Sequence, residues 1–91
     1  MGAHHIKIEN IWSIDNNEYM IYVMDKETQS VLELVYQLDP IVHYWKKDQC
    51  VAIQYKCSKK QAKKWARVNN ITITDGTLPK LQNIEEDEYV D

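Results

Sequence analysis

The sequence contains no phenylalanine and only two glycines, two prolines and two cysteines among its 91 residues. With Gly2 and Gly76 alone, the chain has no glycine-rich loop of the kind that wraps phosphate groups. Without phenylalanine, the large core candidates are three tryptophans and six tyrosines, which are amphipathic. The apolar fraction of 44% is nevertheless sufficient for the core of one small domain.

The two cysteines predict neither a disulfide nor a metal site. Cys50 and Cys57 lie in one predicted strand, about 23 Å apart at about 3.3 Å per residue, whereas a disulfide requires Cα atoms within about 7 Å. A structural zinc site needs close pairs of cysteine or histidine from two chain segments. His4, His5 and His43 do not provide that spacing. We therefore expect reduced thiols, no metal and no cofactor.

Long apolar segments are also missing. The sequence has no apolar run of about 18 residues, and no charged and then apolar leader with a cleavage site. It therefore predicts neither a transmembrane span nor a secretory signal. The expected location is the cytoplasm, which would be that of a host cell if the protein is viral.

Charge is segregated along the chain, although the net charge is only −3. Residues 1–45 carry two cations and seven acids, residues 46–70 carry eight cations and one acid, and residues 71–91 carry one cation and six acids. A block of one sign creates a local field that selects partners of the opposite sign. The basic segment 46–70 therefore predicts an anionic partner.

Alternating apolar residues predict strands over much of the chain. The expected strands are residues 6–14, 18–24, 31–38, 41–46, 50–57 and 71–74. Polar residues at 25–30 and 47–49 then form hairpin loops. Residues 31–38 also fit a helical stripe, so this segment is either a strand or a short helix with Thr28 near its N-terminus.

The clearest predicted element is a helix over residues 58–69. Ser58 and Gln61 have the spacing of a capping box, in which the serine hydroxyl accepts from the backbone of residue 61 and the glutamine reaches back. Asn69 or Asn70 is expected to take the left-handed conformation that ends the helix. The apolar face, which we expect to pack on the sheet through Trp65, consists of Ala62, Trp65, Ala66 and Val68.

The opposite face of this helix is cationic. It consists of Lys59, Lys60, Lys63, Lys64 and Arg67, which fill an arc of about 140° at about 100° per residue. Like charges at i, i+4 and lysines at the positive end of the helix dipole together cost roughly 1 to 2 kcal/mol. Nucleic-acid phosphates, an acidic patch on another protein, or the chain's own acidic tail would offset this cost. The alternative is a solvated lysine face whose long stems cover apolar surface.

Together these elements predict an α+β fold, with a small antiparallel β-sheet of five to six strands and one amphipathic basic helix packed on it. Residues 1–80 are expected to form a single domain, and residues 81–91 an acidic, flexible tail. Within that tail, one acidic cluster is either a solubilising segment or a set of closely spaced carboxylates placed where a nuclease expects phosphates. This cluster consists of Glu85, Glu86, Asp87 and Glu88.

The predicted function is non-enzymatic protein binding through segregated charged surfaces. The expected contact residues are the five cations of the helix, Lys46 and Lys47, and the acidic cluster 85–88. Small acidic proteins of this size are typical of inhibitors, such as phage-encoded anti-defence proteins and immunity proteins paired with toxins. The expected partner is therefore a protein that itself handles nucleic acid.

The alternative function is direct nucleic-acid binding by the basic helix 58–69. The candidates for base contacts and stacking are Gln61, Arg67, Asn69, Asn70, Tyr44, Trp45 and Tyr55. Fourteen acids and an isoelectric point near 5.5 oppose this alternative, and no nucleic-acid motif is present. Catalysis is not expected, because no serine or cysteine has a histidine and a carboxylate at suitable spacing. His43, near Tyr44 and Asp39, is the remaining candidate base.

Overall fold

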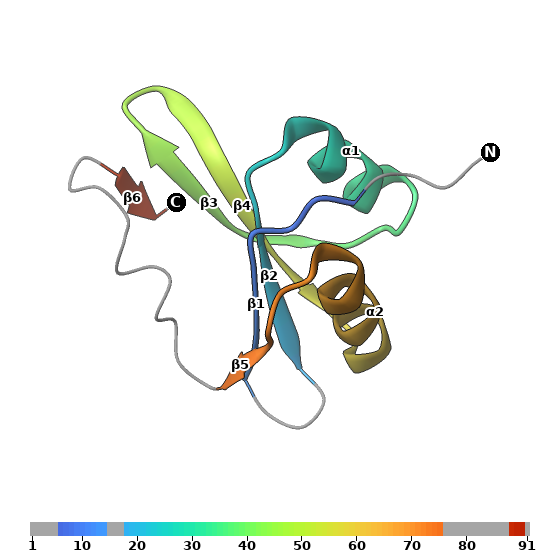
Figure 1. Cartoon of the computed structure of the whole chain (residues 1–91). Coiled ribbons are helices and arrows are strands. Elements are labelled where there is room, and N and C mark those ends of the chain that lie inside the picture. Colours follow the sequence, from blue (N-terminus) through green and yellow to red (C-terminus); the bar gives the residue numbers. More distant parts are fainter. Residues whose placement is uncertain (1–5, 15–17, 76–87, 91) are drawn as a thin grey trace.

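In the described part of the chain, six strands form one mixed sheet, and two helices lie on the same side of it (Figure 1). The computed structural model describes residues 6–14, 18–75 and 88–90. The helices are α1 (Lys26–Leu34) and α2 (Lys59–Asn69). The strands are β1 (Asn10–Ser13), β2 (Tyr19–Val23), β3 (Pro40–Lys46), β4 (Gln49–Cys57), β5 (Thr74–Asp75) and β6 (Glu88–Val90). The predicted α+β class is confirmed.

The sheet has the order β5-β1-β2-β4-β3-β6, and one of its edges is parallel. β5 pairs with β1 in parallel, while the other four neighbouring pairs are antiparallel. The prediction of a wholly antiparallel sheet is therefore wrong at this edge. The reason is that α2 carries the chain back along the sheet after β4, so the next strand runs in the direction of β4 and hence of β1.

The second predicted hairpin is confirmed, because β3 and β4 pair across a turn at Lys47 and Asp48. The first predicted hairpin is wrong. Helix α1 occupies most of the expected loop at 25–30 and the first half of 31–38. The Asp25 carboxylate caps α1 by accepting from the backbone N–H of Thr28 at 2.9 Å. Leu32, one turn further along, is fully buried. The alternative of a short helix with Thr28 near its N-terminus is therefore confirmed, although the helix covers residues 26–34 and not 31–38.

The N-terminal strand is shorter than the predicted 6–14. Ile6 and Ile8 are buried as expected, but pairing with β2 begins only at Glu9, whose N–H donates to the Tyr22 carbonyl at 3.0 Å. The N–H of Lys7 donates to the Thr28 hydroxyl at 3.0 Å, and that of Ile8 donates to the Asn69 side chain at 3.1 Å. These two bonds tie the chain entering β1 to both helices.

Helix α2 forms as the sequence predicts. The Ser58 hydroxyl accepts from the backbone N–H of Gln61 at 3.1 Å, and the Gln61 side chain accepts from the backbone N–H of Ser58 at 3.1 Å. Both halves of the capping box are therefore present. Asn70 ends the helix in the left-handed conformation, with φ of 56°.

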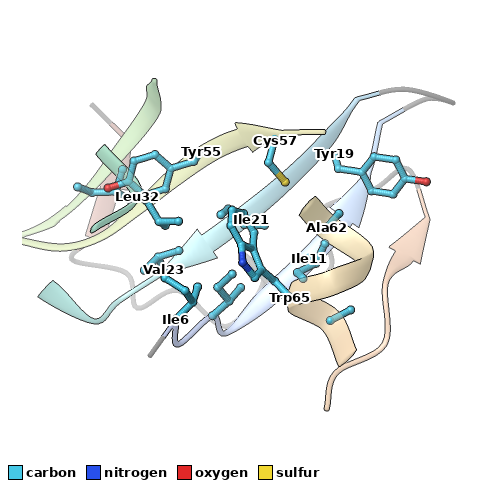
Figure 2. Close-up of a cluster of buried hydrophobic side chains, with 13 residues drawn as sticks. Ile6, Ile11, Tyr19, Ile21, Val23, Leu32, Tyr55, Cys57, Ala62 and Trp65 are labelled. Carbon is cyan, nitrogen blue, oxygen red and sulfur yellow. The ribbon is translucent and has the colours of Figure 1, made fainter. Parts of the chain in front are cut away.

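Trp65 attaches α2 to the sheet. Only 2% of its surface is exposed, and Figure 2 shows its indole pointing from α2 toward Ile21 of β2. Tyr36, in the connection between α1 and β3, packs edge-to-face against the same indole with ring centroids 5.3 Å apart. The shared core continues along the sheet through Ile11, Val23 and Tyr55 to Leu32 of α1. The prediction that α2 packs on the sheet through Trp65 is confirmed.

We expect Trp65→Ala to destabilise the protein by about 3 to 5 kcal/mol, as large-to-small changes in cores do. In a domain of this size, that loss approaches the whole free energy of unfolding. Urea denaturation followed by circular dichroism measures it. Val68→Ala is the matched control, because Val68 lies on the same helix with 60% of its surface exposed and should change stability by less than about 0.5 kcal/mol. Equal effects of the two changes would contradict the role of Trp65.

Candidate functional site

The cationic face of α2 points away from the sheet. Its five members, Lys59, Lys60, Lys63, Lys64 and Arg67, are all exposed. The buried residues of the same helix are Ala62, Trp65 and Ala66, so the division into two faces follows the prediction with one exception. Val68, expected on the apolar side, is exposed beside the cations. The exception arises because Val68 lies at the border of the apolar arc, one turn after Lys64.

None of these five cations lies within ion-pair distance of a carboxylate in residues 6–14 and 18–75. In contrast, the ammonium group of Lys56, just before α2, is 3.1 Å from the Glu18 carboxylate. The face is therefore a group of neighbouring positive charges whose mutual repulsion the described structure does not offset. Such a surface attracts anionic groups strongly when salt is low.

The basic segment of the sequence divides into two separate places in the fold. Lys46 and Lys47 lie at the tip of the β3–β4 hairpin, whereas α2 follows the other end of β4. The length of β4 separates them by about 26 Å, at about 3.3 Å per residue. Figure 1 shows the hairpin tip and α2 on opposite sides of the molecule. The structure does not bring these two predicted parts of the contact surface together.

The acidic cluster is described only at its last member. Glu88 begins β6, which pairs antiparallel with β3 so that Glu88 lies opposite Lys46. Glu85, Glu86 and Asp87 lie outside the described residues. The described end of the cluster is thus at the hairpin tip and not on α2, and the larger tail prediction for 81–91 stays a prediction.

An open groove of about 480 Å³ adjoins the first turn of α2. One wall is the connection from α1 to β3, and the other is the junction of β4 with α2. The lining residues are Gln37, Leu38, Asp39, Ile41, Lys56, Cys57, Ser58 and Gln61. Sequence reasoning missed this groove, because its residues come from separate segments that only the fold brings together. The one local signal was the break at Asp39 and Pro40 between two apolar runs.

Several residues proposed for nucleic-acid contacts have other roles. The Gln61 side chain completes the capping box, and the Asn69 side chain accepts from the N–H of Ile8 while donating to the Trp65 carbonyl at 2.9 Å. Tyr44 and Tyr55 are buried within the sheet, where they cannot stack on a base. Burial raises the pKa of both phenols, and the Glu33 carboxylate, which accepts from Tyr55 at 2.6 Å, raises that of Tyr55 further.

His43, the candidate base, packs against Trp45 with ring centroids 6.4 Å apart in a stacked arrangement. Asp39 lies in the groove described above. Across the ranges that the structure describes, no cluster of three histidine, cysteine or acidic residues has a geometry that could hold a metal ion. In the same ranges, neither helix is long and apolar enough to cross a membrane.

Comparison with known proteins finds no matching family model, no similar curated protein and no similar solved structure. The interpretation of the surface therefore depends on its own geometry and charge.

We expect Lys60→Glu to raise the stability of the isolated protein by about 0.5 to 1 kcal/mol. The change removes the repulsion between Lys60 and Lys64 and places a negative charge at the positive end of the helix dipole. Lys60→Gln, which removes the repulsion without adding the favourable charge, should give a smaller increase. Thermal denaturation at low salt measures both. A loss of stability in either variant would mean that Lys60 makes a favourable contact within the fold.

The two thiols should differ in reactivity. Burial raises the pKa of the Cys57 thiol to about 12, so almost no thiolate forms at Cys57 near pH 8. Cys50 is only half-buried, and its thiol donates to the Ala52 carbonyl at 3.4 Å. We expect iodoacetamide to modify Cys50 first in the native protein and both residues in urea. Peptide mass spectrometry identifies the order, and faster modification of Cys57 would contradict its burial.

Proposed function

We propose that this chain is a non-enzymatic binding module that docks onto an acidic surface of a partner protein through the cationic face of α2. By its size and segregated charge, the module acts as an inhibitor or modulator of a protein that handles nucleic acid, in the manner of phage anti-defence or immunity proteins. It works inside the cell and requires no cofactor.

The observation that carries the proposal is the set of five exposed cations on one helix face, none of which is paired with a carboxylate in the described part of the chain. Repulsion among them costs free energy in the isolated protein. A complementary acidic surface removes that cost on binding and also increases the rate of association through long-range attraction. A surface that served only for solubility would not need charge of a single sign on one face.

Two further observations favour a protein over nucleic acid as the partner. First, four of the seven side chains expected to contact bases are occupied or buried, namely Gln61, Asn69, Tyr44 and Tyr55, which leaves Arg67, Asn70 and the half-buried Trp45. Second, the groove beside the cations contains the carboxylate of Asp39 and the apolar side chains of Leu38 and Ile41. A phosphate backbone would gain little from Leu38 and Ile41, whereas a protein surface offers apolar side chains that can cover them.

The nucleic-acid alternative predicts a salt dependence that is easily measured. If the α2 cations neutralise phosphates, the logarithm of the affinity for DNA or RNA should fall by about 0.7 to 0.9 per contacted phosphate for each tenfold rise in salt. We expect no binding of labelled duplex or single strands at physiological salt. Tight binding there by the unmodified protein would reject protein docking as the main function.

We expect the triple change Lys60→Glu, Lys63→Glu and Arg67→Glu to preserve the fold and to weaken the complex with the native partner, chiefly by slowing association. The partner is first isolated by pull-down from cells that encode the chain, with and without nuclease, and identified by mass spectrometry. Surface plasmon resonance then measures the rates. Lys63→Glu and Lys47→Glu compare the two predicted contact regions, because each reverses one exposed lysine, the first on α2 and the second at the tip of the β3–β4 hairpin. If the triple change leaves the complex unaffected, the cationic face is a solvated surface without a role in binding.

A further inference from the structure

The groove beside α2 has apolar, cationic and acidic parts in a fixed arrangement. Leu38 and Ile41 supply apolar surface, Lys56 lies on the α2 side in its ion pair with Glu18, and Asp39 lies on the connection between α1 and β3. Its volume of about 480 Å³ is in the range of known ligand-binding clefts. Lys59 and Lys60 follow directly after Ser58, which lines the groove, so the cationic face of α2 begins at its rim.

Ile41 is placed at this groove by an irregularity in β3. The pairing of β3 with β4 shifts register between Pro40 and Val42, which face Tyr55 and Gln54, so Ile41 is the extra residue at the shift. Bulges of this kind redirect a side chain away from its expected position in a strand. The result is an isoleucine with 46% of its surface exposed at the edge of a groove. When a partner covers an exposed apolar side chain in a groove, the burial of apolar surface stabilises the complex.

We infer that this groove binds an acidic and apolar segment of the partner protein, with apolar side chains on Leu38 and Ile41 and carboxylates along the cations of α2. This inference rests on the proposed function and specifies the chemistry of the partner. Charge complementarity selects the occupant, because Lys59 and Lys60, which have no carboxylate partner in the described residues, lie at the rim on the α2 side. Asp39 on the other wall repels carboxylates, so it directs the acidic side of the segment toward α2.

The probes are fluorescein-labelled peptides of about ten residues, which are long enough to follow the roughly 16 Å of α2 at about 1.5 Å per residue. In them, glutamate or aspartate alternates with leucine, isoleucine or phenylalanine. One control set replaces every acid with lysine, and a second replaces every apolar residue with serine. Fluorescence anisotropy should show saturable binding to peptides of the first set only. Absence of saturable binding to any acidic and apolar peptide overturns the inference.

Ile14 provides a matched control for Ile41, because both are isoleucines with 46% of their surface exposed but only Ile41 lines the groove. We expect Ile41→Ser to weaken peptide binding by about tenfold, equal to about 1.4 kcal/mol, and Ile14→Ser to have no effect. Ile41→Asp should weaken it further, because the new carboxylate repels the acidic segment. Equal effects at the two positions would assign the peptide to another surface.

The inference and the proposed function fail in different ways. If only the inference is wrong, charge reversal on α2 weakens the native complex while Ile41→Ser leaves it unchanged. If the proposed function is wrong, the charge reversal itself has no effect on the complex. Analytical ultracentrifugation tests a second copy of this chain as occupant, and a dimer that dissociates in Ile41→Ser would overturn the choice of an acidic partner segment.

Discussion

The burial of Trp65 between α2 and the sheet is the contact on which the surface of this protein depends. A helix fixed by one large side chain cannot rotate about its own axis, so the burial of this indole decides which residues face solvent. The five cations are exposed because they lie opposite it. Tyr36, packed on the same indole, holds the connection from α1 to β3 in place and thereby sets one wall of the groove. The packing of the core therefore determines the position of the candidate binding surface.

Stability and charge oppose each other along α2. The capping box supplies about 1 kcal/mol or more at the N-terminus, which is comparable to the cost of placing Lys59 and Lys60 there. The free energy gained by burying Trp65 is larger than either the capping contribution or the cost of the two lysines. The helix can therefore retain an unfavourable charge pattern without unfolding. The fold also separates charges that are neighbours in the sequence, because β4 carries Lys46 and Lys47 away from α2.

The parts of the fold that the sequence predicts are those encoded by local signals. Ser58, Gln61 and Asn70 are enough to place both ends of α2, and the alternating residues around Lys47 and Asp48 are enough for the second hairpin. The sequence favours a loop over helix α1 because the opening turn of α1 is polar, and its two distinguishing features are the Asp25 cap and the burial of Thr28 and Leu32. The parallel pairing of β5, the groove and the burial of Tyr44 all depend on residues distant in the chain, for which periodicity carries no information.

The one-residue connection between β4 and α2 determines how much the backbone can adjust on binding. β4 ends at Cys57 and α2 begins at Lys59, so Ser58 alone connects them, and its side chain and backbone are both held in the capping box. No residue there is free to act as a hinge. The backbone of the cationic face is consequently preorganised, and the entropy lost on binding comes mainly from the long lysine and arginine side chains. On binding a partner, the side chains of this surface change rotamer while the backbone keeps its conformation.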